Sequence, residues 1–198
     1  MAKSRTAETA GVLACLLVLV PFTAAHGQSL DSAVLDELNF ARTQPQAYAR
    51  VLEDEAQRSR ASGAYDDPAA FHEAVAFLER QQPLPPLSAD DALSEAALDH
   101  AALQARDGGF GHGGGEPLSQ RLRRYGAFAS LMAEDIAYGY ADPREVVSQL
   151  IVDSGVPGRG HRANIFNPTF RTLGVACGPH PTYGVMCVTD FASRLMRR

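Results

Sequence analysis

Hydrophobic positions recur with the 3.6-residue period of an amphipathic helix in several stretches of this 198-residue chain. A helix is predicted where such a stretch also carries a capping residue or a proline at its first turn. Ser88 followed by Asp91, for example, forms a capping-box pattern, while the prolines of 83–87 favour an extended connector. These signals place helices at 29–42, 45–60, 68–81, 88–107, 117–125 and 142–153, with a loop at 61–67.

A strict alternation of large and small side chains replaces the helical period at 131–138. This segment is predicted to be a strand, with Glu134 on its larger apolar face. Two further strands, at 172–178 and 183–191, are rich in Val, Thr, Tyr and Phe and flank a predicted turn at 179–181. Many helices and few strands, two of them paired late in the chain, indicate an α+β layered domain.

Two histidines lie in glycine-rich loops, where the backbone can follow an irregular path. His112 lies among the six glycines of 108–115, and His161 lies in the segment 158–168, which ends at an Asn-Pro pair. Loop residues positioned by a rigid scaffold often carry function. Asp153 ends the helix 142–153 on the same side as its apolar residues, five residues before Gly158.

His112, Glu134, Asp153 and His161 are therefore the candidate site residues. Imidazole and carboxylate groups together are compatible with a divalent metal site that leaves an open position. They are equally compatible with a hydrogen-bonded cluster that holds the loops without a metal. His100, by contrast, faces small apolar residues of its helix and is predicted to be a core residue, and the arginines near 121–124 are predicted to form a solvated face.

The first 27 residues have the pattern of a secretory signal peptide. A positive start at Lys3 and Arg5 precedes an apolar run of about a dozen residues and small residues suited to cleavage after Ala25 or Gly27. The run is too short to span a membrane, and no later stretch is long enough. We therefore expect export to the periplasm or the extracellular space, and a single domain over residues 28–198.

The net charge restricts the class of binding partner, and the cysteine content bears on disulfide formation. Without residues 1–27, 16 of the 18 basic and 22 of the 23 acidic residues remain, a net charge of −6, which argues against nucleic-acid binding. Cys177 and Cys187 are then the remaining cysteines. In an exported protein such a pair predicts a disulfide between neighbouring strands, and a free buried pair is the alternative.

The order and spacing of several short motifs resemble the CAP superfamily, whose members share the SCP domain. The superfamily includes cysteine-rich secretory proteins, antigen 5 and plant pathogenesis-related proteins. The resemblance covers residues 35–191, although 51–82 fits it poorly and the chain lacks the tryptophan that the family commonly has near Leu150. It rests on Leu38-Asn39 with Arg42, on 84–87 with Leu93, Ala96, Ala97 and His100, on Phe110-Gly111-His112, on Glu134-Asp135 where the family has Glu then Asn, and on Gly160-His161-Arg162 with Asn164-Ile165.

The resemblance implies a three-layer α-β-α sandwich whose cleft is lined by His112, Glu134, Asp153 and His161, Asp153 standing where the family usually has Glu. It also implies that His112, His161 and Glu134 bind a divalent cation, zinc or calcium, and that the cleft takes a small apolar ligand such as a sterol or fatty acid. The alternatives are a metal-assisted hydrolase with Glu134 or Asp153 as general base, and a structural or interaction domain without metal.

Overall fold

The computed structural model describes residues 28–58 and 67–197. Seven α-helices lie in these ranges, and most begin at the capping residue that the sequence offers. Ser29 and Asp67, for example, accept hydrogen bonds from the first-turn N–H groups of Ser32 and Ala70. The helices are α1 (Leu30–Thr43), α2 (Pro45–Arg58), α3 (Pro68–Arg80), α4 (Asp91–Asp107), α5 (Leu118–Arg124), α6 (Pro143–Val152) and α7 (Gly160–Ile165), the last preceded by the 3-10 turn η1 (Pro157–Arg159).

The predicted helices are confirmed with shifts of a few residues at their ends. The exception is the start of α4, where the predicted capping box at Ser88 is wrong. Ser88 instead pairs with Thr172 in a short strand, and the carboxylate of Asp90 caps the helix by accepting from Ala92 N and Leu93 N. The predicted loop at 61–67 lies outside the described residues apart from Asp67, as do the last two residues of the helix predicted over 45–60.

A four-stranded sheet runs through the middle of the domain in the order β1-β4-β5-β3. The pairs β4–β5 and β5–β3 are antiparallel, and β1 is parallel to β4. The predicted turn at 179–181 starts two residues later than expected, because residues 179 and 180 still belong to β4. The strands are β1 (Ser88–Ala89), β3 (Met132–Tyr138), β4 (Thr172–His180) and β5 (Gly184–Ala192), and a separate antiparallel pair consists of β2 (Ala127–Phe128) and β6 (Met196–Arg197).

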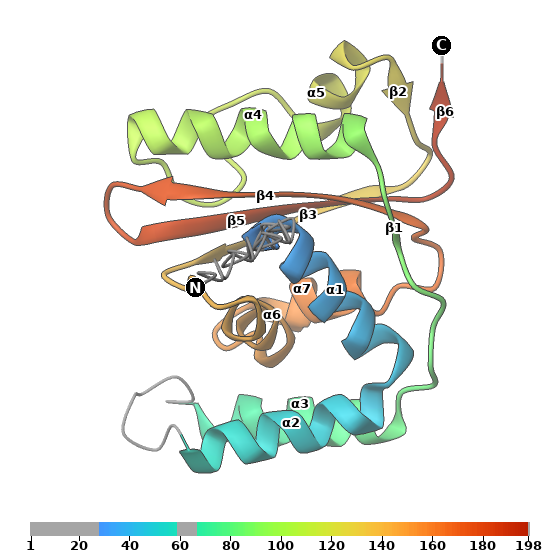
Figure 1. Cartoon of the computed structure of the whole chain (residues 1–198), viewed down its shortest axis with the longest axis vertical. Helices are drawn as coiled ribbons and strands as arrows, with labels where there is room; N and C mark the ends of the chain where they lie inside the picture. Colours follow the sequence, from blue (N-terminus) through green and yellow to red (C-terminus); the bar gives the residue numbers. More distant parts are fainter. Residues whose placement is uncertain (1–27, 59–66, 198) are drawn as a thin grey trace, which may run out of the picture.

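Helices cover both faces of the sheet, as Figure 1 shows. α4 and α5 lie on one face, and α1, α6 and α7 lie on the other, with α2 and α3 stacked beyond them. The larger hydrophobic core fills the second side and a smaller one lies beneath α4. The predicted three-layer α-β-α sandwich is therefore confirmed.

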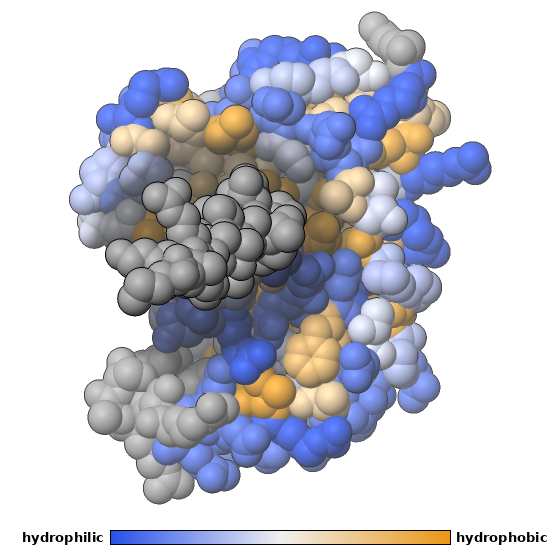
Figure 2. Space-filling model, viewed as in Figure 1, coloured by the Kyte–Doolittle hydropathy of each residue, from blue (hydrophilic) through white to orange (hydrophobic). Residues whose placement is uncertain are grey.

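The disulfide between Cys177 and Cys187 is confirmed too, and it joins directly opposed residues of β4 and β5. The face of the molecule seen in Figure 2 is mostly hydrophilic with scattered apolar patches. Among residues 28–58 and 67–197, no helix combines the length and apolar character that crossing a membrane requires.

Candidate functional site

A cavity of about 720 Å³ opens on the side of the sheet's β3 edge. Its walls come from the glycine-rich loop after α4, from β3, from α6 and from the segment around α7. Of the four predicted site residues, His112, Asp153 and His161 line this cavity directly. Glu134 lies behind His112, with its side chain 8% exposed.

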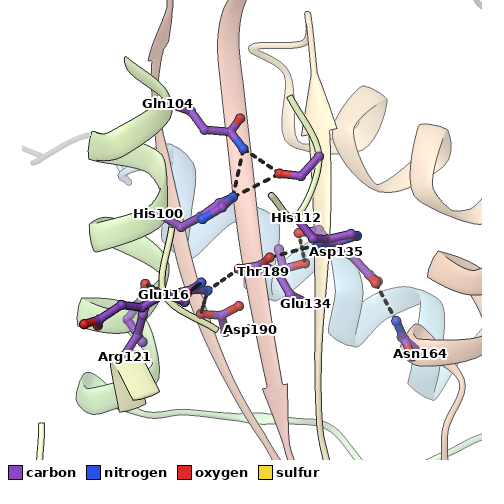
Figure 3. Close-up of polar contacts among 12 residues, drawn as sticks. His100, Gln104, His112, Glu116, Arg121, Glu134, Asp135, Asn164, Thr189 and Asp190 are labelled. Atoms are coloured by element: carbon purple, nitrogen blue, oxygen red, sulfur yellow. Dashed lines mark hydrogen bonds and ion pairs between the residues drawn. The ribbon is translucent and has the colours of Figure 1, made fainter. Parts of the chain in front are cut away.

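The glycine-rich loop is held against the sheet by residues of α4 and β3. His100 is buried, and its Nε2 lies 3.1 Å from the carbonyl oxygen of Gly111, to which the Gln104 amide also donates at 2.6 Å. The hydroxyl of Tyr138 accepts from Gly111 N at 2.9 Å. The prediction that His100 is a core residue is confirmed, and its physical effect is to fix the loop that carries His112 (Figure 3).

His112 and Glu134 form the first half of the site. The Nδ1 of His112 lies 2.9 Å from Oε1 of Glu134, while Oε2 accepts from the guanidinium of Arg121. The hydrogen bond with Glu134 raises the pKa of His112 above its ordinary value, although partial burial opposes it. Burial by itself would raise the pKa of Glu134, but the contacts with His112 and Arg121 outweigh burial and lower it.

Arg121 is buried, so the prediction of a solvated face at this residue is wrong. Its guanidinium donates to the carbonyl oxygens of Ala96 and Glu116, both at 2.9 Å, and reaches Asp190 Oδ2 at 3.4 Å. Asp190 is fully buried on β5, directly opposite Glu134 on β3. Burial, together with the charge of Glu134, raises the pKa of Asp190 well above its usual range. One guanidinium thus faces two carboxyl groups (Figure 3), and the opposite pKa shifts favour the charged form of Glu134 over that of Asp190.

His161 and Asp153 form the second half of the site. Asp153 is the left-handed C-cap of α6, with φ of 57°, and this conformation turns its side chain back over α7. Its Oδ1 lies 2.7 Å from Nδ1 of His161, and its Oδ2 accepts from the backbone N–H groups of His161 at 2.9 Å and Arg162 at 3.3 Å. The carboxylate therefore orients the imidazole and also satisfies the first turn of α7.

Two buried arginines fix α7 in its place. Arg42 of α1 donates to the carbonyl oxygens of Pro85, Ile165 and Asn167. Arg162 donates to the carbonyl oxygens at the end of α6 and pairs with Glu73 at 3.0 Å. His161, which was predicted to lie in a loop, lies in the first turn of α7. Its position is therefore set by the long-range contacts of α7 with α1, α3 and α6.

Each imidazole has the geometry that a metal-binding histidine commonly shows. An Nδ1–H bonded to a carboxylate leaves Nε2 as the free lone pair, which is the nitrogen that a metal or a ligand can use. The four residues nevertheless stand as two histidine–acid pairs, and within the described ranges no group of three His, Cys, Asp or Glu side chains is assembled for a metal. Zinc or calcium ligation by His112, His161 and Glu134 stays a prediction.

Asp135 is a buried acid next to the site that the site prediction did not include. Its Oδ1 accepts from the amide of Asn164 on α7 at 2.6 Å, while its Oδ2 has no hydrogen-bond partner. Burial raises the pKa of Asp135 well above its usual range, and the charge of Asp153 adds to the effect. The available signal was the resemblance itself, in which Asp135 stands where the related proteins have asparagine.

Asp135→Asn is expected to raise the free energy of unfolding by about 1–3 kcal/mol near pH 8. Above about pH 4 the unfolded chain releases this proton while the folded protein retains it, so wild-type stability falls as pH rises toward the raised pKa. Asparagine keeps the acceptor for Asn164 and does not titrate. Urea unfolding should show the gain near pH 8 and little gain near pH 4, whereas Asp107→Asn, on the exposed end of α4, should have little effect at either pH. A gain that is independent of pH would contradict this account.

The sequence matches the family model described as the cysteine-rich secretory protein family over residues 35–191. The chain belongs to this family, also called CAP. None of the curated proteins compared with it matches.

The comparison with solved structures finds bacterial proteins. An extracellular protein containing an SCP domain from Bacillus anthracis is 25% identical over 56% of this chain and 35% of its own, with a TM-score of 0.47. An outer surface protein from Borrelia burgdorferi is 22% identical, over 56% of this chain and 80% of its own, with a TM-score of 0.47. A cysteine-rich secretory protein from Staphylococcus aureus is 14% identical over 56% and 33%, with a TM-score of 0.43. The CAP chain described here thus spans about a third of the first protein's length.

Proposed function

We propose that this CAP protein is exported and that its cavity binds a divalent cation, zinc in preference to calcium, through Nε2 of His112 and His161. The observation that carries the proposal is that both imidazoles line one cavity and that each has Nδ1 bonded to a buried carboxylate. Neutral imidazole is a good ligand for zinc, whereas calcium prefers oxygen ligands. A bound ion would supply an open coordination position for a polar group of a ligand.

In this proposal Glu134 and Asp153 orient the imidazoles and do not ligate the ion themselves. Both oxygens of Glu134 are engaged, by His112 and Arg121, and both oxygens of Asp153 are engaged by His161 and backbone N–H groups. Carboxylates held in this way strengthen the basicity of a metal-binding histidine. They are poorly placed to take a proton from water, so the geometry favours a binding protein over a metal-assisted hydrolase.

Covalent hydrolysis receives no support from the serine near His161. The hydroxyl of Ser154 donates to Asp67 at 2.9 Å. A serine nucleophile would instead need its hydroxyl within reach of a general base such as an imidazole.

Calorimetric titration of zinc into the purified protein tests the proposal, with calcium as the second ion. Zinc should bind to the wild type, and the His112→Ala/His161→Ala variant should lose that heat while keeping its circular dichroism spectrum. His72→Ala, which removes an exposed histidine of α3, should bind as the wild type does. Asp153→Asn should weaken zinc binding by about 10- to 100-fold, the usual effect of removing a carboxylate partner. Equal heats in all proteins, or none, would leave two histidine–acid pairs that serve structure only.

A further inference from the structure

Three aromatic rings gather at one end of the cavity, and we call this group the aromatic ledge. It consists of Phe110 from the glycine-rich loop, Tyr138 from β3 and Tyr183 from the β4–β5 turn. Phe110 stacks on Tyr138 with ring centroids 4.8 Å apart, and Tyr183 lies 5.0 Å from Tyr138 and 5.8 Å from Phe110. Phe110 is 67% exposed and Tyr183 is 43% exposed, so two of the three rings offer open surface.

The backbone segments that carry the ledge are held by hydrogen bonds, although two of its rings are exposed. The hydroxyl of Tyr138 donates to Gln104 at 2.7 Å and accepts from the N–H of Gly111, next to Phe110. His180 lies beneath the rings, with Nε2 at 2.8 Å from the carbonyl oxygen of Gly109 and with Nδ1 accepting from the N–H of Tyr183. A preorganised apolar surface loses little conformational entropy when a ligand binds.

The ledge and the two site histidines belong to the same cavity. All three rings line it together with His112 and His161. The wall between them is apolar, formed by Ile136, Leu150, Val152 and Val156. A ligand held at the histidines would therefore extend over aliphatic surface onto the rings.

The polar groups around the cavity decide which chemistry fits the ledge. None of the described lining residues is Lys or Arg, so an anionic group meets no permanently charged side chain of opposite sign in the cavity. Asp67 and Asp153 are bonded to Ser154 and His161, at the histidine end of the cavity, so neither carboxylate is held against the three rings. The hydroxyl of Tyr138 and both ring nitrogens of His180, which pack against the rings, already have partners, so the free surface of the ledge is mainly the faces of the rings.

We propose that the aromatic ledge is a binding subsite for an uncharged aromatic ring, such as an indole or phenol group carried by the ligand of this cavity. A planar ring can extend the Phe110–Tyr138 stack and contact Tyr183, and because Phe110 and Tyr183 are exposed, an indole N–H or phenol O–H can keep its hydrogen bond to water. This inference rests on the proposed function, because it describes a second part of the ligand whose polar group is held at the histidines. Binding of the aromatic ring does not require the cation, so the aromatic subsite and the cation site can be disproved separately.

The absence of tryptophan from the chain provides a direct test. N-acetyl-L-tryptophanamide, excited where tyrosine does not absorb, is titrated with the protein in the presence of a chelator, so that neither intrinsic indole nor metal contributes. We expect a saturable change in probe fluorescence. Phe110→Ala and Tyr183→Ala should each weaken binding by about threefold or more, the size of one lost aromatic contact.

Leu98→Ala is the matched control, because Leu98 is 49% exposed on α4 and does not line the cavity. It should bind the probe as the wild type does, and methyl glucoside and N-acetyl-lysinamide should not displace the probe. No saturable binding, an equal loss in all three variants, unchanged binding in both ring variants, or displacement by the sugar or the amine would each overturn the proposal. The zinc titration, performed without the probe, reports separately on the histidines.

Discussion

Replacing Arg121 with methionine should lower the free energy of unfolding by about 3–5 kcal/mol, the usual result of removing one partner from a buried ion pair. The guanidinium is the positive group that faces both Glu134 and Asp190, which lie directly opposite each other on β3 and β5. Without it, two carboxyl groups remain buried with their main countercharge removed. The carbonyl oxygens of Ala96 and Glu116 lose their donor as well.

Compensating substitutions separate this electrostatic cause from simple loss of packing. Urea unfolding of Arg121→Met should be compared with the same change in a Glu134→Gln/Asp190→Asn background, where neither side chain can ionise. The loss should be clearly smaller in that background. Arg124→Met serves as the control, because Arg124 lies on the same helix but is half exposed, and its ion pairs with Asp99 and Glu116 should contribute little to stability. An equal loss in both backgrounds would mean that the charges do not matter.

The elements of this fold could be predicted well because their signals are local. Caps such as Ser29, Asp67 and Asp142 mark helix starts through hydrogen bonds to residues two or three positions on. The prediction at Ser88 was wrong because a non-local contact overrides the local signal there. Its capping pattern is local, but its backbone N–H is taken by the carbonyl of Arg171, a partner 83 positions away that no local pattern reveals.

The contacts within the candidate site could not be predicted from the spacing of its residues along the sequence. Asp153 and His161 are eight residues apart, but only the family resemblance, not their spacing, placed them in one cleft, where the structure pairs them. Arg121 and Asp190 are 69 residues apart, and their meeting depends on how α5 crosses the sheet. Three arginines close together in a short helix look solvated from the sequence. Only the fold distinguishes Arg121, which is buried, from Arg124, which is exposed.

Gly174→Ala should be the other strongly destabilising change, with a loss of about 3 kcal/mol or more. A Cβ at Gly174 would lie 2.1 Å from the carbonyl carbon of Leu93 and 2.2 Å from the N of Ser94. Both atoms belong to the backbone of α4, so no side-chain rotation can relieve the clash and the helix itself must move. Gly174 is thus the position on β4 that allows α4 to approach the sheet closely.

Gly178→Ala is a matched control for this effect, since Gly178 lies on the same strand and a Cβ there meets nothing within 4 Å. It should be neutral or slightly stabilising in urea unfolding, because alanine has less backbone freedom to lose than glycine. Equal losses in the two variants would show that close packing of α4 is not the cause. The displacement should also reach the site, because α4 supplies the Ala96 carbonyl that holds Arg121, and Arg121 in turn holds Glu134 on His112. A Gly174→Ala protein that still folds should therefore bind zinc more weakly than Gly178→Ala does.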